Sequence, residues 1–549
     1  MQQSFRHFIL VVFVALCLCN GSALAEAETS TLESELRQKI ENGFIYSSSA
    51  KTHAYEAKAL NDFFSAWYSK KVFRPFWIDS GVVSWRAFEL IEAIEDAYGH
   101  GLNPETYFLT PIRKRLNSTD SKSLAELELL LMLAATTLST DAKAGRMELR
   151  RIDAAEFSSV KFGRPELENI LKEVIAHSDL GQAIANQFPR HKQYQKMKSA
   201  LAAYRSIINE GDWTSVPSAG GPLKLGSSGP RVLALSQRLK ETGDLPESSA
   251  IEETFNTTLE EATRLFQKRH GIPATGEVHQ QTFAALNISA KKRMETLLIN
   301  LERWRWLARD FSEGKEVFVN IAGFELFALE GSTLELRMPV IVGKAFNATP
   351  VFSGHIQQIE FNPYWKVPQS IAGTEILPKL KKNPNYLADE HMKLFKAGSG
   401  YKSEISPNSI LWNTVSKAQM NRYTVRQEPG PWNALGFLKF IFPNPYSVYL
   451  HDTATRGLFS KHDRALSHGC IRVSSPVELA AFLLSTPKDN WNKDRVQELI
   501  TMGGHQFVRL PKPVLLHLTY RTAWVDSDGT INFRPDVYKR DAKLVAVLK

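Results

Sequence analysis

The chain has 549 residues, of which 43% are hydrophobic and 23% charged, and its formal net charge is +9 at pH 7. This length predicts about three or four domains rather than one core. The composition excludes wholesale disorder and a polytopic membrane protein. The positive charge favours anionic surfaces, but no dense Lys/Arg block interleaved with aromatic residues occurs, so nucleic acid is not an expected partner.

The first 25 residues have the layout of a signal peptide. Arg6 precedes an apolar run at 8–18, and Ala23-Leu24-Ala25 stands just before Glu26. The run is shorter than the roughly 20 residues that span a bilayer as a helix. We therefore predict export with cleavage after Ala25 and membrane contact only before cleavage; a retained anchor is the alternative.

The positions of the three cysteines bear on the chemistry of the protein. The three cysteines are Cys17, Cys19 and Cys470, so the mature protein would keep a single thiol in an oxidising compartment. No internal disulfide can then form, and a lone exported thiol risks oxidation. Either Cys470 has a chemical role or it is a plain buried cysteine.

The next region predicts helices. Residues 31–215 form a helical scaffold domain in this interpretation, with the apolar stretch 127–135 as its central helix. A linker rich in Pro, Gly and Ser at 216–222 ends the domain.

A compact pattern of three helices follows at 223–287. Pro230 opens the first helix, the second is closed at His270-Gly271-Ile272-Pro273, and the third runs from Val278 to Leu286. This pattern resembles the three-helix peptidoglycan-binding domain. A small helical spacer without a ligand is the alternative.

From residue 290 to 545 the sequence predicts a mostly β domain. Short β-rich runs bounded by Gly and Ser lie at 317–321, 324–329, 336–342, 447–451 and 506–510. Between them, residues 368–426 turn polar and helix-like, and so long an excursion inside a β domain predicts a functional lid. The whole chain is thus a multidomain α+β protein.

The residues that carry chemistry lie at the ends of two predicted strands. His451 is followed, after residues 452–466, by Ser467-His468-Gly469-Cys470-Ile471-Arg472-Val473. A cysteine attacks an amide carbonyl as thiolate, which its ordinary pKa near 8.5 leaves scarce at neutral pH, so a neighbouring base is needed. His451 is the expected base, and His468 is the competing candidate.

The neighbours of Cys470 predict supporting roles. Gly469 permits a tight turn and close substrate approach, while backbone N–H groups of Gly469 and Cys470 could meet a developing oxyanion. Arg472 alternates with Ile471 and Val473 as on a strand, and either binds a substrate carboxylate or makes a structural ion pair.

No metal or other cofactor is expected at this site. His451, His462 and His468 lie close in sequence, but with one cysteine and no HExxH spacing they make a poor zinc set. His462 is interpreted as a solvent-facing loop residue.

The His, the gap and the Ser-His-Gly-Cys segment resemble the L,D-transpeptidase family with its YkuD-type catalytic domain. The segments 362–371, 426–436, 520–524 and 533–538 are similar to the large YcbB-type subgroup, which combines a helical scaffold, a peptidoglycan-binding module and the catalytic domain. The sequence differs from a widely used form of the family motif at Arg472, where that motif has Asn. The role of the family's Asn is therefore not assigned to Arg472.

The resemblance implies a reaction and a place. Cys470 would attack the bond between residues three and four of a peptidoglycan tetrapeptide stem, release D-Ala and form a thioester that an amine of a second stem resolves as a 3-3 cross-link. His451 would move the protons, and Ser467, His468, Gly469 and Arg472 would support the site. Stem peptides are the implied partners, other wall-synthesis proteins are further candidates, the periplasm is the implied location, and carbapenems would acylate Cys470.

Two other classes of function remain open. One is an exported cysteine hydrolase, such as an L,D-carboxypeptidase, in which water is the acceptor. The other is a wall-binding scaffold without catalysis. The order of His before Cys disfavours a papain-like hydrolase, and the sequence leaves open whether cross-linking, D-amino-acid exchange or hydrolysis dominates.

Overall fold

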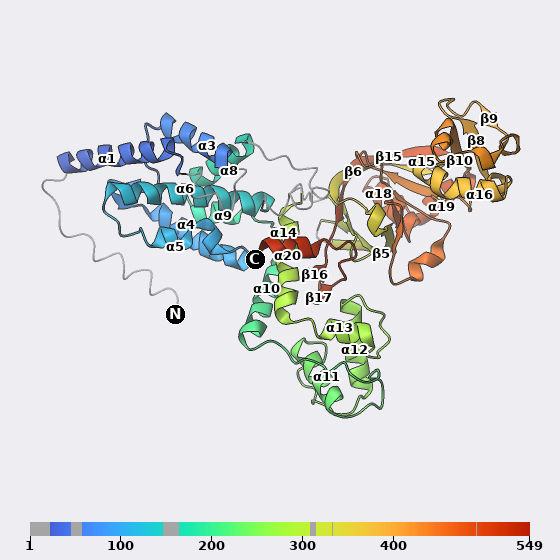
Figure 1. The fold of residues 1–549 in the computed structure, drawn as a ribbon, viewed down its shortest axis with the longest axis horizontal. Helices are drawn as coiled ribbons and strands as arrows, with labels where there is room; N and C mark the ends of the chain where they lie inside the picture. Colours follow the sequence, from blue (N-terminus) through green and yellow to red (C-terminus); the bar gives the residue numbers. More distant parts are fainter. Residues whose placement is uncertain are drawn as a thin grey trace. The chain divides into compact units, whose positions relative to one another are not determined.

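The computed structural model describes residues 22–44, 57–146, 164–307, 314–331, 333–489 and 491–548. Most of the predicted signal segment, including Cys17 and Cys19, lies outside the described residues. The chain divides into two compact units (Figure 1). The first comprises Met1–Ile152, Val160–Ser206 and Leu297–Trp306; the second comprises Asp153–Ser159, Ile207–Thr296 and Leu307–Lys549.

The first unit is helical and is built around α6, Ser121–Ala144 (Figure 1). Asp120 caps this helix by accepting a hydrogen bond from the backbone N–H of Ser123 at 2.8 Å. Within the described part of the chain, α6 alone is long and apolar enough to cross a membrane, yet 89% of its most apolar window is buried in the protein. The predicted central stretch is therefore a core helix. The other α-helices of this unit are α1 (Ser22–Glu41), α3 (Ala57–Lys70), α4 (Trp85–Asp96), α5 (Leu109–Arg113), α8 (Arg164–Ala176), α9 (Leu180–Ala185) and most of α10 (Lys192–Asn209).

The second unit begins with a small three-helix domain. Its helices are α11 (Pro230–Glu241), α12 (Thr257–Arg269) and α13 (Gln280–Leu286), and a bridge between Leu223 and Val278 closes it. Apolar residues at helical spacing, such as Leu235, Leu259 and Phe266, form its core. Helix α14, Ala290–Arg305, follows; its residues up to Thr296 belong to the second unit and those from Leu297 to the first.

The rest of the second unit is a sheet closed on itself. Nine strands follow the order β13-β5-β14-β12-β11-β6-β15-β3-β4, and β4 also pairs with β5. Because the first and last long strands pair, no long edge is left open for aggregation. The strands are β3 (Lys315–Asn320), β4 (Glu325–Glu330), β5 (Thr333–Gly343), β6 (Phe352–Phe361), β11 (Leu438–Ile441), β12 (Leu450–His451), β13 (Ala465–Ser467), β14 (Ile471–Val473) and β15 (Gln506–Thr519).

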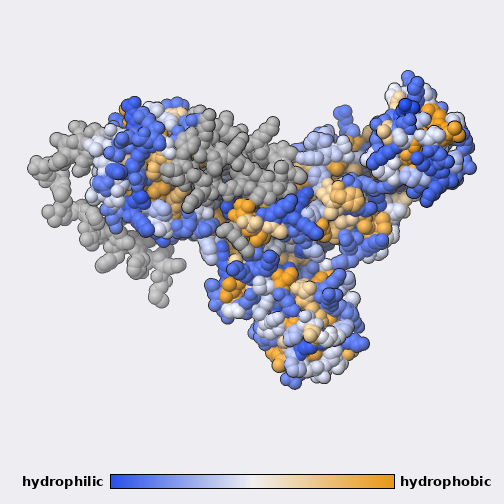
Figure 2. All heavy atoms as spheres, in the orientation of Figure 1, coloured by the Kyte–Doolittle hydropathy of each residue, from blue (hydrophilic) through white to orange (hydrophobic). Residues whose placement is uncertain are grey.

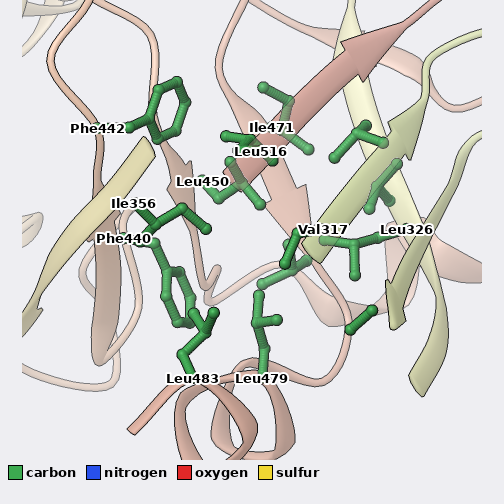
Figure 3. Close-up of a cluster of buried hydrophobic side chains, with 14 of the residues drawn as sticks. Val317, Leu326, Ile356, Phe440, Phe442, Leu450, Ile471, Leu479, Leu483 and Leu516 are labelled. Atoms are coloured by element: carbon green, nitrogen blue, oxygen red, sulfur yellow. The ribbon is translucent and has the colours of Figure 1, made fainter. Parts of the chain in front are cut away.

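One face of this sheet packs into an apolar core. Leu450 and Ile471 point inward from adjacent strands, and Leu479 and Leu483 approach them from a helix (Figure 3). That helix is α18, Pro476–Leu484, and α19, Lys493–Met502, packs beside it. After β15 the chain forms a hairpin of β16 (Ala523–Val525) and β17 (Ile531–Phe533), and ends in α20 (Asp541–Leu548).

The excursion between β6 and β11 is a compact subdomain with its own apolar core, to which Leu380, Leu394 and Trp412 contribute. It holds short helices, which the sequence predicts, and a four-stranded sheet in the order β7-β10-β8-β9, which the sequence analysis did not predict. Figure 2 shows a mainly hydrophilic surface on its visible face. Its elements are β7 (Trp365–Lys366), α15 (Gln369–Ile371), a π-helical turn (Ala372–Ile376), α16 (Leu377–Lys382), α17 (Tyr386–Asp389), β8 (Met392–Lys396), β9 (Glu404–Ile405) and β10 (Tyr423–Gln427).

The predicted fold class is confirmed: a helical N-terminal region, a three-helix domain and a mostly β C-terminal domain. Polar linkers separate regions whose hydrophobic residues follow periods of 3.6 or 2, which is why the sequence predicts this class.

Candidate active site

His451 and Cys470 are brought together by two parallel neighbouring strands. Strand β12 pairs with β14 so that Leu450 lies opposite Ile471 and His451 opposite Arg472. Cys470 immediately precedes β14 and is half-buried. Ordinary strand spacing and rise correspond to about 8 Å between the Cα atoms of two residues placed as Cys470 and His451 are.

The alternation of a β-strand separates this site from the core. Leu450 and Ile471 face inward (Figure 3), so His451 and Arg472 face the opposite side. On that side Lys439 of β11 lies directly opposite His451, and Glu360 of β6 lies directly opposite Lys439. A row of charged and ionisable side chains thus crosses four adjacent strands.

The imidazole of His451 is buried and its tautomer follows from its partner. Its Nδ1 hydrogen-bonds to the backbone carbonyl of Asp452, which can only accept, so Nδ1 carries the proton and Nε2 has the free lone pair. Burial, together with the positive charges of Arg472 and Lys439, lowers the pKa of His451 to about 3, against the opposing effect of that carbonyl. The ring is therefore neutral at physiological pH and can accept a proton.

The strand carrying His451 is held by Asp452. Its carboxylate accepts hydrogen bonds from the backbone N–H of Phe437 at 2.9 Å and from Arg456 at 2.7 Å. Gly436 packs so closely that a Cβ there would lie 2.3 Å from the Asp452 carboxylate. This packing fixes the carbonyl that orients His451.

Tyr449 is the neighbour that contacts the Cys470 thiol. Both its hydroxyl and its backbone N–H hydrogen-bond to the cysteine side chain. Burial raises the pKa of the Cys470 thiol, while the Tyr449 hydrogen bonds and the charges of Lys439 and Arg472 act in the opposite direction. Cys470 is therefore a thiol in the resting protein. Hydrogen-bond donors and positive charges that stabilise its thiolate are already in place around it.

The turn before Cys470 is held by the Ser467 hydroxyl. It accepts a hydrogen bond from the backbone N–H of Gly469 at 3.1 Å and donates one to the carbonyl of Cys470 at 2.6 Å. Gly469 has φ +118°, and a Cβ there would make only ordinary contacts, so the glycine is required by backbone conformation rather than by space.

A second brace reaches this turn from the end of the chain. The Thr349 hydroxyl donates to the carbonyl of Gly469 at 2.8 Å and accepts from the backbone N–H of Gly343 at 2.9 Å. The hydroxyl of Tyr538 in turn donates to the carbonyl of Gly343 at 2.6 Å and accepts from the backbone N–H of Thr349 at 3.2 Å. Three residues from two other regions of the chain therefore help to fix the position of the Cys470 turn.

The remaining candidates make hydrogen bonds or ion pairs with other parts of the second unit. His468 pairs through Nε2 with Glu375 of the inserted subdomain at 2.7 Å, and both side chains are partly exposed. Arg472 donates to the Thr455 hydroxyl at 3.2 Å. His462 is exposed, as predicted, and also hydrogen-bonds to the carbonyl of Gly271. The His468 imidazole is thus engaged by the inserted subdomain.

Four residues near the site are not predicted from the sequence: Tyr449, Lys439, Thr349 and Tyr538. Tyr449 carried a usable signal, because it is two residues before His451 on a strand and so shares its face. No local sequence pattern identifies Lys439 or Thr349, because the strand register that brings them to the site depends on residues far away in the chain. Within the described ranges, no group of three or more His, Cys, Asp or Glu side chains is arranged to hold a metal ion.

Three family matches cover much of the chain. Residues 314–497, which contain both His451 and Cys470, match YkuD, the L,D-transpeptidase catalytic domain. The chain contains a YkuD L,D-transpeptidase domain. Residues 62–201 match the family described as "Scaffold domain", and residues 228–286 match the family described as "Putative peptidoglycan binding domain". The resemblance to the L,D-transpeptidase family is therefore confirmed.

Individual proteins are similar to parts of this chain. A Haemophilus influenzae protein named "Putative L,D-transpeptidase" is 30% identical over 306 residues, which cover 54% of this chain and 59% of that protein. The match thus spans less than two thirds of this relative. Solved L,D-transpeptidase structures from Xylanimonas cellulosilytica and Stackebrandtia nassauensis are 17% and 16% identical, covering 55% and 56% of this chain and 100% and 96% of theirs. Their TM-scores are 0.18 and 0.20, and no argument rests on them.

Proposed function

We propose that this protein is an exported L,D-transpeptidase that forms 3-3 peptidoglycan cross-links, with Cys470 as nucleophile and His451 as base. The observation that carries the proposal is the pairing of β12 with β14, which sets a neutral, buried imidazole next to the strand that begins after Cys470. A neutral histidine beside a thiol is the pair that cysteine acyl transfer requires.

The residues support a two-step reaction. His451 Nε2 takes the thiol proton as the Cys470 sulfur attacks the carbonyl carbon between residues three and four of a tetrapeptide stem. The carbonyl oxygen becomes an oxyanion, for which the backbone N–H groups of Gly469 and Cys470 are the proposed donors. As the carbon–nitrogen bond breaks, His451 returns the proton to the departing D-Ala amine and a thioester remains.

The second step uses the same residues. An amine of a neighbouring stem loses its proton to His451 and attacks the thioester carbonyl, so an amide forms and the Cys470 thiol is regenerated. The subdomain at 365–427 contacts the catalytic motif through Glu375 and His468. Such a lid would exclude water and favour the amine as acceptor.

Labelling with a carbapenem tests the nucleophile. The β-lactam carbonyl should acylate Cys470 in the wild type, giving a mass increase that the Cys470→Ala variant does not show. His451→Gln should fold but acylate slowly. No adduct on the folded wild type would contradict the proposal and support a wall-binding scaffold.

Muropeptide analysis tests the acceptor. Cells that express the wild type should contain 3-3 linked dimers that are missing with Cys470→Ala. Tripeptide stems without dimers would instead indicate an L,D-carboxypeptidase. Export is tested by fusing residues 1–25 to a reporter enzyme that is active only outside the cytoplasm; an inactive fusion would contradict a periplasmic location.

A further inference from the structure

Lys439 lies at the centre of the charged row that crosses the catalytic sheet. It is directly opposite His451 on one neighbouring strand and directly opposite Glu360 on the other. Directly opposed residues of antiparallel strands hold their Cβ atoms about 5 Å apart, so the three side chains are neighbours on one face.

The ammonium of Lys439 is fixed by contacts on both sides. Its Nζ is 3.1 Å from a carboxylate oxygen of Glu360, which is 8% exposed and therefore rarely reached by water. The other carboxylate oxygen of Glu360 lies 2.9 Å from Nε2 of His505. Lys439 Nζ also lies 4.6 Å from the centre of the Tyr449 ring. An ion pair and a cation–π contact together restrict this otherwise flexible side chain.

These contacts bring a permanent positive charge close to the reacting sulfur. Tyr449 has Lys439 over its ring and hydrogen-bonds to Cys470 through its hydroxyl. The titratable and charged groups that face Lys439 are Glu360 from β6, Tyr449 just before β12, His451 from β12, Arg472 from β14 and His505 before β15. Within that set, His451 is neutral, so it does not supply a standing positive charge to a thiolate.

We propose that Lys439 is a positioning residue of this site, whose ammonium, tethered by Glu360 and stacked on Tyr449, balances the negative charge of the Cys470 thiolate. The proposal rests on the proposed function, in which Cys470 is the nucleophile. The charge of Lys439 differs from that of the imidazolium formed when His451 takes the thiol proton, because Lys439 does not exchange that proton.

The test measures the pH dependence of Cys470 alkylation by iodoacetamide, read by mass spectrometry on the peptide that contains Cys470. Iodoacetamide reacts with the thiolate, so its rate follows the ionised fraction. Lys439→Met should displace the rate profile by about one pH unit to higher pH, which is about tenfold slower alkylation at pH 8, with the curves converging at the highest pH. Lys439→Arg keeps the charge and should stay within about threefold of the wild type.

Two further variants complete the test. Lys512→Met removes an exposed lysine of β15 away from the charged row and should leave the profile unchanged. Lys439→Met combined with Glu360→Gln removes the buried carboxylate together with its cation, so no buried charge is left unpaired. This double variant is used if Lys439→Met alone unfolds. Its rate profile should be displaced to higher pH by the same amount.

Two results would overturn the proposal. One is a Lys439→Met profile that superimposes on the wild type. The other is a rate lowered by the same factor at every pH, which would indicate a change in access to the sulfur rather than in its charge. Alkylation needs no peptidoglycan substrate, so a wild type that alkylates normally but forms no cross-link would refute the proposed function alone.

Discussion

At the scale of single residues, the Ser467 hydroxyl joins the two ends of the turn that presents Cys470. It accepts from the N–H of Gly469 and donates to the carbonyl of Cys470. Because both bonds fix backbone rather than substrate, we expect Ser467 to position the nucleophile and the oxyanion donors without touching the reacting atoms.

Ser467→Ala should therefore slow carbapenem acylation by about 100-fold, since small displacements of reacting groups cost factors of this size. The free energy of unfolding should fall by only about 1–2 kcal/mol for two lost hydrogen bonds. Acylation is followed by mass spectrometry and unfolding in urea. Ser460→Ala, which removes an exposed hydroxyl bonded to the carbonyl of Gly457, is the control and should change neither. Wild-type acylation by Ser467→Ala would contradict the assignment.

The ionisation states of the pair predict a flat pH profile. Burial lowers the pKa of His451 to about 3 and raises that of Cys470 above its ordinary value, so between pH 5 and 8 the imidazole is neutral and the thiol mostly protonated. The reactive form, thiol plus neutral base, then has a nearly constant population. Carbapenem acylation by the wild type should change less than about threefold over this range.

Without the base, acylation depends on the thiolate alone. His451→Gln should react slowly at pH 5 and faster by about tenfold per pH unit, because the ionised fraction of a thiol grows tenfold per unit below its pKa. A wild-type rate that rises just as steeply would show that His451 does not take the proton in the rate-limiting step.

The sequence predicts the nucleophile and its neighbours well, but it does not predict the residues that reach the site from other strands and loops. Cys470 and the residues around it lie in one contiguous segment, so local sequence is sufficient to find them. Lys439 and Thr349 reach the site through strand register and a distant loop. Which strands pair is decided by the whole closed sheet, and no local pattern specifies it.

At the scale of elements, the inserted subdomain is tied to the catalytic motif by the pair of Glu375 and His468. Glu375 lies on the π-helical turn Ala372–Ile376, next to α16. Both side chains are partly exposed, so the contact should contribute less than about 1 kcal/mol and break readily. A weak contact suits a lid that has to open for each substrate.

Glu375→Gln should loosen that contact and admit water to the thioester. We expect the ratio of hydrolysis to cross-linking to rise about two- to fivefold, in keeping with a contact worth less than about 1 kcal/mol. Product ratios from purified tetrapeptide muropeptides measure it. Glu404→Gln breaks another exposed ion pair of the same subdomain, with Lys393, and serves as the control. An unchanged ratio in Glu375→Gln would argue against this contact as a closing device.

Strand β15 is longer than the sequence predicts. The sequence predicts a strand at 506–510, yet β15 continues through Pro511 and Pro513 to Thr519. Pairing with β6 is lost between Arg509 and Val514 and resumes afterwards, while the later half also pairs with β3. Prolines are tolerated there because the register shift removes the hydrogen bonds that they could not make.

At the scale of the whole molecule, the end of the chain contributes to the site. Tyr538 lies outside the matched catalytic residues 314–497, yet its hydroxyl bridges Gly343 and Thr349, and Thr349 holds Gly469. Tyr538 is itself fixed by Tyr520, whose hydroxyl accepts from the backbone N–H of Tyr538 at 2.8 Å.

Tyr538→Phe should therefore reduce acylation although the residue does not face the substrate. We expect a loss of about tenfold, smaller than for Ser467→Ala because Thr349 retains its own bond to Gly469. The thermal midpoint should fall by a few degrees at most. Tyr386→Phe removes a phenol hydroxyl that binds Lys379 in the inserted subdomain and should leave acylation unchanged. Equal rates for Tyr538→Phe and the wild type would exclude the brace.

The closed sheet also has a practical meaning for anyone who trims this protein. A fragment that stops at residue 497 keeps the thiol and the imidazole but lacks β15, which pairs with β6 on one side and β3 on the other. Both remaining strands would then present bare backbone to solvent, the usual start of insoluble aggregates. A minimal soluble domain therefore has to run on through Tyr538, well past the boundary that family similarity suggests.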